Sequence, residues 1–175
     1  MPRPRCARSE GRPVLPVPSP QLMRTVLGRF ATGVTIITCR DADGAPVGLT
    51  ANSFQALSLE PPLVLWSLRL ESPTLAAFGE ARHFGVNVLA ESQIDLSRCF
   101  ASSRADKFSE GHWRDGEGGV PLLDGAAAIF ECETASQQPA GDHLLIIGRV
   151  LRLSDGALPP LLFHGGRYHL LGEIL

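Results

Sequence analysis

Apolar and β-branched residues occur in short runs along the chain, and turn residues separate most of these runs. Val34–Cys39 is a dense β-branched run that predicts a strand. Asp41–Gly44 supplies turn residues, so we expect the chain to return as a partner strand over Pro46–Ala51. Leu63–Leu68 is almost entirely apolar, which is typical of a strand buried on both faces. The pattern predicts further strands over 52–59 in part, 83–89, 126–134 and 143–153, and a final hairpin of 161–163 and 168–171 around Gly165 and Gly166.

Helical signals are fewer and shorter than strand signals. Pro20 suits the first turn of a helix and apolar residues follow it near helical spacing, so a helix is expected over about 20–30. A short helix is expected directly after Ser72–Thr74, with Ser72 or Thr74 as its N-cap residue. Residues 92–100 suit a third helix, with apolar residues loosely gathered on one side.

The strand count and the connections indicate the fold class. About six or seven strands, mostly sequential and joined by short turns, favour an antiparallel barrel over a βαβ sheet, so the fold is expected to be mainly β with short helices. No internal repeat is evident, which predicts a single domain over residues 20–175. Residues 1–19 are rich in Pro and Arg and are expected to form a disordered tail. The polar segment 101–119 is predicted to be a long surface excursion, and such loops are often functional.

Composition and charge narrow the function classes. Hydrophobic residues make up 44% of the 175 residues and charged residues 19%, as in ordinary globular proteins. The formal net charge of −2 gives no basic field, so no nucleic-acid partner is expected. No apolar run approaches the roughly 20 residues of a membrane span, and the first 20 residues lack the apolar core of a secretory signal. We therefore expect no membrane association and a cytoplasmic location.

The four cysteines are Cys6, Cys39, Cys99 and Cys132. They are widely spaced, with no C-x-x-C pair and no histidine at metal-ligand spacing. In a reducing compartment they are expected to be free thiols, and Cys39 and Cys132 are expected to pack as small hydrophobic residues. No metal site is predicted.

Gly48–Phe54 concentrates two hydroxyls, an amide and several backbone donors between apolar flanks at the end of a strand. A flavin ring needs such a surface, with hydrogen-bonding groups along one edge and apolar contacts on its faces. The alternative is a polar strand-to-loop transition that satisfies its own backbone. Composition alone does not decide between the two interpretations.

Other polar residues have a structural and a functional interpretation as well. Ser72–Thr74 provides hydroxyls that hold a phosphate at a helix N-terminus or that simply cap the helix. Arg98, Arg104 and Lys107 bring positive charge to the long excursion and the helix before it, which suits a phosphate, although exposed cations are usually just solvated. The pair of Arg98 and Cys99 can instead face solvent and core respectively.

Gly141-Asp142-His143 precedes a strand, so His143 is expected to project from the rim of the barrel. A histidine there can contact a nicotinamide or a flavin, oriented by Asp142 or by a backbone carbonyl. A single histidine more often has a structural role. Three rival motifs are missing from the sequence, namely the G-x-G-x-x-G fingerprint, the G-x-x-x-x-G-K-[ST] loop and the G-x-S-x-G elbow, which disfavours Rossmann, P-loop and serine hydrolase proteins.

An ordered set of motifs resembles the short-chain flavin reductase family, the reductase components of two-component flavin-dependent monooxygenases. The resemblance covers roughly residues 20 to 172. The matching segments, in the family's order and spacing, are Phe30–Thr38, Gly48–Phe54, Ser58–Leu65, Phe84–Leu89, Asp106–Phe108, Gly141–His143, Gly148–Val150, Pro160–Phe163 and Gly166–Tyr168.

The resemblance implies the FMN-binding split β-barrel, working as a homodimer with flavin near the subunit interface. It implies an oxidoreductase of the EC 1.5.1 type in which NADH or NADPH reduces FMN or FAD. Reduced flavin then diffuses to a separate monooxygenase. The alternative is a non-catalytic flavin- or haem-binding barrel, because a fold does not fix a function. A flavin oxidase on the same scaffold is a third interpretation.

The resemblance also assigns expected roles to residues of this chain. Thr50, Ala51, Asn52 and Ser53 would line the flavin ring, and Trp66, Ser67 and Leu68 would meet the ring and the ribityl chain. Ser72 and Lys107 would help to hold phosphate, while His143 and Tyr168 would lie on the nicotinamide side. The expected cofactor-binding set is completed by Pro73, Arg98, Cys99 and Phe108.

One position departs from the family pattern. The family often has a basic residue immediately before the Phe that corresponds to Phe100, and this chain has Cys99 there. Arg98 lies one position earlier. This departure leaves open the choice between FMN and FAD and the strength of flavin binding.

Overall fold

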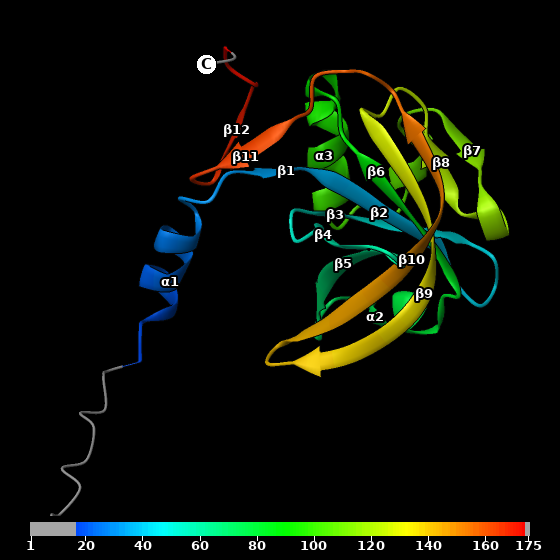
Figure 1. Cartoon of the computed structure of the whole chain (residues 1–175), viewed down its shortest axis with the longest axis horizontal. Coiled ribbons are helices and arrows are strands. Elements are labelled where there is room, and N and C mark those ends of the chain that lie inside the picture. The colour runs from blue at the N-terminus through cyan, green and yellow to red at the C-terminus, as the bar shows by residue number, and fades with distance from the viewer. Residues whose placement is uncertain (1–16, 174–175) are drawn as a thin grey trace, which may run out of the picture.

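The computed structural model describes residues 17–173. Its main element is a seven-stranded antiparallel sheet in the order β3-β2-β6-β9-β10-β5-β4 (Figure 1). The strands are β2 (Thr35–Arg40), β3 (Pro46–Ala51), β4 (Gln55–Leu59), β5 (Pro62–Arg69), β6 (His83–Val88), β9 (Ala128–Ala140) and β10 (His143–Asp155).

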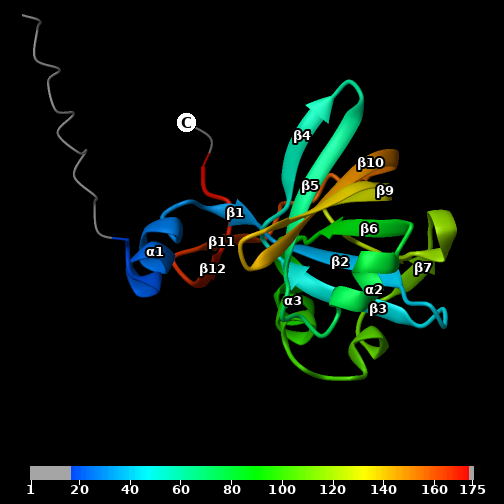
Figure 2. The same cartoon turned by 90° about the horizontal axis from the view of Figure 1, so that it is seen from below.

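The sheet coils into a barrel that stays open between its two edge strands. Figure 2 shows β4 and β5 rising beside the layer formed by β2, β3 and β6. The edge strands β3 and β4 are consecutive in the chain, and residues 52–54 connect them across the opening. The expected split β-barrel is therefore confirmed.

Two hydrophobic clusters hold the barrel together. Inside the barrel, Trp66 packs edge-on against Phe78 with ring centroids 5.0 Å apart, and Phe84 lies 6.1 Å from Trp66. The second cluster lies under helix α3 (Ile94–Ala101) and includes Ile36, Phe100 and strand β8 (Pro121–Leu123). Each large buried side chain of this kind stabilises the fold by roughly 1.5–3 kcal/mol, so both clusters make the strands around the opening rigid.

The long segment after α3 is anchored to the barrel by aromatic residues. Phe108 and Trp113 pack against Phe100 with centroid distances of 5.1 and 5.3 Å. The remaining short elements are α2 (Leu75–Glu80), η1 (Glu91–Gln93), η2 (Lys107–Ser109), β7 (Trp113–Asp115) and η3 (Glu117–Gly119).

A separate arm projects from one end of the barrel (Figure 1). It consists of α1 (Pro20–Leu27) and a small sheet of β1 (Thr32–Gly33), β11 (Leu162–His164) and β12 (Arg167–His169). Ser19 caps α1 by accepting a hydrogen bond from the Leu22 amide. No residue of α1 is buried in this chain, so its apolar side chains lack a packing partner among residues 17–173.

Most predicted elements are present, and several details differ. Strand β5 alternates between buried and half-buried residues, so the expectation of burial on both faces is wrong for the single chain. Strands β1, β7 and β8 were not predicted, and β9 extends to Ala140, beyond the predicted end at residue 134. Thr74 is the N-cap of α2, but its side chain makes no capping hydrogen bond. Residues 1–16 of the predicted disordered tail lie outside the described part of the chain.

Three of the four cysteines lie among the described residues 17–173. Cys39, Cys99 and Cys132 are free and buried, and Cys39 and Cys132 pack in the barrel core as expected. In this part of the chain no group of three or more metal-ligating side chains is found. None of its helices has the length and apolar character needed to cross a bilayer.

Candidate active site

A cavity of about 460 Å³ lies at the opening between the two sides of the barrel. Strand β3 and the following connection form one wall, and the end of β5, the loop after it and the start of β10 form the other. The lining residues are Leu49, Thr50, Ala51, Asn52, Ser53, Ser67, Leu68, Arg69, Glu71, Ser72, Pro73 and His143.

The cavity borders β3, an edge strand whose backbone pairs with a neighbouring strand on one side only. Strand β3 pairs with β2 on one side and ends the sheet on the other. In an antiparallel pair every second residue directs its N–H and C=O away from the partner strand. The Gly48–Ala51 stretch therefore offers backbone donors and acceptors to a molecule in the cavity.

Ser53 joins the two walls across the opening. Its hydroxyl donates to the Ser67 carbonyl at 3.0 Å and accepts from the Ser67 amide at 3.1 Å. Both hydrogen bonds are partly buried. The hydroxyl takes the place of the strand-to-strand hydrogen bonds that are missing at the opening of the barrel. The Ser53 side chain is thus occupied in holding the site, and the Asn52 side chain beside it is exposed.

A hydrogen-bond chain supports the other side of β3. The Thr50 hydroxyl donates to the carbonyl of Ser97 at 2.7 Å, and the Ser97 hydroxyl lies 2.9 Å from the Tyr168 hydroxyl. Tyr168 comes from the arm, so this chain connects the arm to the site. A smaller cavity of about 170 Å³ lies here, lined by Val34, Thr50, Asn52, Ala101, Phe163 and Tyr168.

His143 stands on the opposite wall at the first position of β10. Gly141, with φ of 61°, makes the tight turn from β9, a backbone conformation that favours glycine. The Nδ1 atom of His143 lies 2.8 Å from a carboxylate oxygen of Asp142. This hydrogen bond lowers the pKa of the exposed Asp142 carboxyl. The imidazole is thereby oriented at the cavity rim.

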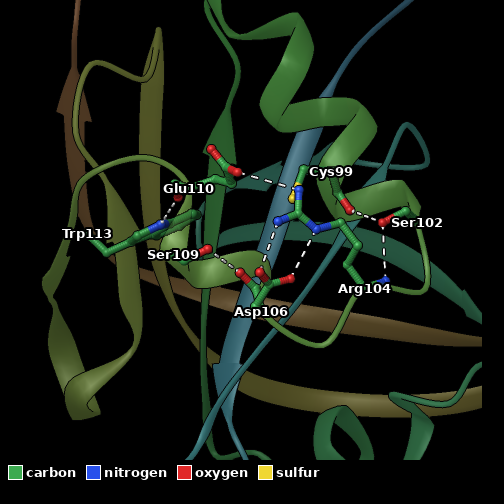
Figure 3. Close-up of polar contacts among 7 residues, drawn as sticks. All are labelled: Cys99, Ser102, Arg104, Asp106, Ser109, Glu110 and Trp113. Carbon is green, nitrogen blue, oxygen red and sulfur yellow. Dashed lines mark hydrogen bonds and ion pairs between the residues drawn. The ribbon is translucent and has the colours of Figure 1, made fainter.

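A third cavity, of about 390 Å³, adjoins the first at Pro73. Lys107 and Arg104 line it, and no carboxylate does. Lys107 donates to the Phe100 carbonyl at 3.2 Å, and burial lowers the pKa of its ammonium group. Figure 3 shows the Arg104 guanidinium turned toward Asp106, at 3.0 Å, with Glu110 at 3.5 Å on the other side. This region is the positively charged end of the site.

The structure brings most of the predicted site residues together. Those that line the main cavity are Thr50, Ala51, Asn52, Ser53, Ser67, Leu68, Ser72, Pro73 and His143. Tyr168 lines the smaller cavity beside Thr50, and Lys107 and Phe108 line the charged one.

Three predicted residues lie elsewhere. The Trp66 side chain is fully buried in the barrel core, because alternation along β5 points it away from the cavity that Ser67 lines. Cys99 is 9% exposed and packs into the core below α3. Arg98 is exposed on the same helix, pairs with Asp95 and lies 5.8 Å above the Tyr168 ring. In the single chain Arg98 therefore faces solvent and Cys99 faces the core, while a contact of either residue with a cofactor stays a prediction.

Sequence reasoning missed Ser97, which is fully buried between Thr50 and Tyr168. Its signal was available, because Ser97 and Phe100 are three residues apart on a predicted helix and share a face. A polar residue on that apolar face needs a buried partner. Arg69 and Glu71, which also line the main cavity, pair with each other at 2.8 Å and gave no such signal.

The donor set fits a flavin ring. A cavity of about 460 Å³ is within the usual range for small-molecule sites. The open edge of β3 supplies backbone groups for the polar edge of a planar ring, and Leu49, Ala51 and Leu68 supply apolar contacts. The adjoining cations suit a phosphate.

Comparison with known proteins agrees with this geometry. A sequence profile of the family described as "Flavin reductase like domain" matches residues 27–172.

The chain belongs to the flavin reductase family.

The chain is 44% identical over 146 residues to the FMN reductase (NADH) SmoA of Agrobacterium fabrum, covering 83% of this chain and 82% of SmoA. It is 42% identical over 147 residues to the reductase component of the flavin-dependent trigonelline monooxygenase of Acinetobacter baylyi, covering 83% of this chain and 47% of that protein. The chain thus spans about half the length of some of its curated relatives.

A solved structure shares the fold at clear sequence similarity. The NADH:FAD oxidoreductase SgcE6 of Streptomyces globisporus, in complex with NAD and FAD fragments, superposes with a TM-score of 0.83 and 34% identity. The match covers 90% of this chain and 98% of SgcE6.

Proposed function

We propose that this flavin reductase is a cytoplasmic NAD(P)H:flavin oxidoreductase of the EC 1.5.1 type. It reduces FMN or FAD and supplies the reduced flavin to a separate monooxygenase. The observation that carries the proposal is the cavity at the barrel opening, where the half-paired edge of β3 faces His143 across a space of about 460 Å³. The free buried thiols suit a reducing compartment.

The chain's own residues bind and orient rather than react. When bound, the flavin accepts a hydride from the nicotinamide. The backbone edge of β3 holds the ring, and Ser53 fixes the distance between the walls. His143, oriented by Asp142, contacts the nicotinamide at the rim, and Tyr168, held by Ser97, closes the other side. Lys107 and Ser72 bind the phosphate end. Holding two reactants in the right geometry is itself a large source of rate acceleration.

The relatives support the chemistry and the partner. SmoA is named an FMN reductase (NADH) and SgcE6 an NADH:FAD oxidoreductase, which favours NADH as the electron donor. The Acinetobacter protein is a reductase component of a monooxygenase. An oxygenase that accepts reduced flavin is therefore the partner we propose.

A steady-state matrix tests this function. Purified protein is assayed for loss of nicotinamide absorbance with NADH or NADPH against FMN, FAD and riboflavin. We expect rapid NADH oxidation only when a flavin is added. Flavin binding without turnover under any pairing would contradict the proposal and support a non-catalytic flavin-binding barrel.

We also propose that the chain works as a homodimer built on the arm. Leu22, Met23, Val26 and Leu27 of α1 are 51–60% exposed, and Phe30 after it is 69% exposed. A row of exposed apolar side chains on one helix is a typical interaction surface. Every second residue along the middle of β5 is only half-buried in the single chain. We propose that a partner copy covers this face of the strand as well.

Light scattering after size-exclusion chromatography tests the dimer. The double variant Leu22→Asp/Val26→Asp is expected to elute as a monomer, because charges on the apolar face oppose its burial. Thr25→Asp, on the polar side of the same helix, is the control and should stay dimeric. A monomeric unmodified chain would overturn the proposal.

A further inference from the structure

A fully buried serine joins the arm to the edge strand of the main cavity. Ser97 lies inside α3 and is 0% exposed. Its carbonyl accepts a hydrogen bond from the Thr50 hydroxyl at 2.7 Å. Its hydroxyl lies 2.9 Å from the hydroxyl of Tyr168, and either oxygen can donate. Figure 1 shows α3 beside the point at which the arm leaves the barrel. One residue of α3 therefore contacts both β3 and β12.

Two neighbouring residues of α3 hold the side chain of Tyr168. Ser97 bonds its hydroxyl, and the Arg98 guanidinium lies 5.8 Å from the centre of its ring, which is within the range of a cation–π contact. The ring of Phe163 packs edge-on against the same ring at a centroid distance of 5.5 Å. Three side chains thus fix the position of the Tyr168 ring relative to the barrel.

The Tyr168 ring forms part of a wall beside the main cavity. It lines the cavity of about 170 Å³ together with Phe163, and Thr50 and Asn52 line both this cavity and the main one. A shift of the Tyr168 ring would therefore change the space next to two residues that border the proposed flavin position. Ser97 lines neither cavity, so it acts on this space through Thr50 and Tyr168.

Stability alone does not explain a hydroxyl at this position. Phe100, three residues further along α3, belongs to the apolar cluster below the helix. Replacing both partners of a buried hydrogen bond by apolar groups of the same shape can be neutral or even stabilising, so an alanine facing a phenylalanine could fill this place. A hydrogen bond adds what apolar packing lacks, because it requires a particular distance and direction between its two groups.

We propose that Ser97 is a positioning residue for hydride transfer, which fixes the Tyr168 ring on the nicotinamide side relative to Thr50 on the edge strand. The inference rests on the proposed flavin reductase function. Ser97 touches neither reactant, and its effect is on their mutual orientation. Without the bond, the flavin still binds along β3, but the nicotinamide is held less well against it, and poor orientation slows transfer.

Single-turnover kinetics tests the inference. An excess of protein over FMN or FAD is mixed with saturating NADH without oxygen, and flavin reduction is followed as the loss of flavin absorbance. Tyr168→Phe and Ser97→Ala should each lower this rate about fivefold and leave the flavin dissociation constant within twofold of that of the unmodified protein. The double variant should be no slower than the slower single variant, because each substitution alone already removes the bond.

Thr134→Val is the matched control for the loss of a partly buried hydroxyl. The Thr134 hydroxyl donates to the Ala81 carbonyl at 2.9 Å, and Thr134 lines neither of the two cavities. This variant should lose stability, as Ser97→Ala does, and should reduce flavin at the rate of the unmodified protein.

The outcomes separate this inference from the proposed function. If the unmodified protein and Tyr168→Phe reduce flavin at the same rate, the positioning role of Ser97 is wrong and the reductase function stands. Multiplying losses in the double variant, or an equal slowing in Thr134→Val, would also overturn the role. No flavin reduction by the unmodified protein would remove both. Because Tyr168→Phe keeps the ring and its packing, it tests the same bond even if Ser97→Ala fails to fold.

Discussion

The two ends of the proposed flavin site, the main cavity and the charged cavity beside it, are built from different interactions. At the ring end, Ser53 spans the opening with two partly buried hydrogen bonds to Ser67, and Thr50 is held by Ser97 inside the fold. At the phosphate end, Arg104 is held by Asp106 and Glu110, all of which are exposed to solvent. Buried hydrogen bonds are costly to lose, whereas exposed ion pairs exchange readily.

This difference assigns different tasks to the two ends. Hydride transfer requires the reacting atoms to be held within a few tenths of an ångström, so the ring end needs rigid walls. Selectivity between ligands requires side chains that can exchange their protein partners for ligand atoms. A loop is therefore suited to the phosphate end of the site. We therefore expect substitutions at the ring end to change turnover and stability, and substitutions at the phosphate end to change affinity alone.

The largest effect is expected from His143→Ala. Loss of the imidazole at the rim should lower kcat/KM for NADH by on the order of a hundredfold, because the nicotinamide is no longer held against the ring. Flavin affinity should remain nearly unchanged. Steady-state kinetics and flavin fluorescence titration measure the two quantities, with His112→Ala as a control at an exposed histidine that lines neither the main nor the charged cavity. A parallel loss of flavin binding would show that His143 belongs to the flavin rather than to the nicotinamide.

Ser53→Ala should be the next largest change. The substitution leaves the amide and the carbonyl of Ser67 without partners, which costs about 1–3 kcal/mol of unfolding free energy. Chemical denaturation measures this loss. Ser103→Ala, on the exposed part of the loop, should change the unfolding free energy by less than about 0.5 kcal/mol. If the two variants had the same unfolding free energy, the Ser53 bridge across the opening would not contribute to the stability of the ring end.

Gly48 lies between the two ends and connects them. A Cβ atom there would approach Phe100 Cε1 to 2.8 Å and Phe108 Cζ to 3.1 Å. Gly48→Ala should therefore destabilise the fold by about 1–2 kcal/mol through overpacking and loosen the loop that Phe108 anchors. Gly79 is the matched control, because it lies in α2 with no atom within 4 Å of the added Cβ. Gly79→Ala should stabilise the fold by up to about 1 kcal/mol.

The smallest effect is expected from Asp142→Asn. The hydrogen bond to His143 lowers the pKa of the Asp142 carboxyl, so the carboxylate orients His143 at all pH values above its ordinary pKa near 3.8. That interaction is lost only as the pH falls through the lowered value. The variant should reduce kcat/KM for NADH a few-fold, equally from pH 6 to pH 9. A reduction that varied with pH across this range would contradict a purely orienting role for the Asp142 carboxylate.

Much of the fold follows from local sequence signals. The β-branched run before Asp41–Gly44 forms β2, and Pro46–Ala51 forms β3 with the predicted bounds. Gly165 and Gly166, with φ of 57° and 79°, make the predicted final hairpin. These elements depend on short-range patterns of turn residues and apolar residues, which the sequence displays directly.

The missed features depend on contacts between distant segments. Which face of β5 is buried depends on how the sheet coils, so Trp66 could not be assigned to the core from its neighbours Ser67 and Leu68. Ser97 gains its role only when Thr50 and Tyr168 come to lie on either side of it. The charged cavity was likewise not predictable, since the folded loop brings Lys107 next to Pro46.

Hydrogen exchange of the backbone amides, with and without saturating flavin and in the absence of nicotinamide, tests the central claim most directly. Unpaired amides on the open edge of β3 should exchange rapidly in the free protein and become protected when the ring binds. We predict protection over residues 48–54 with riboflavin, FMN and FAD, extending to residues 102–108 with FMN and FAD, which carry phosphate. Protection confined to the arm, or unchanged exchange along β3, would contradict a flavin site at the barrel opening.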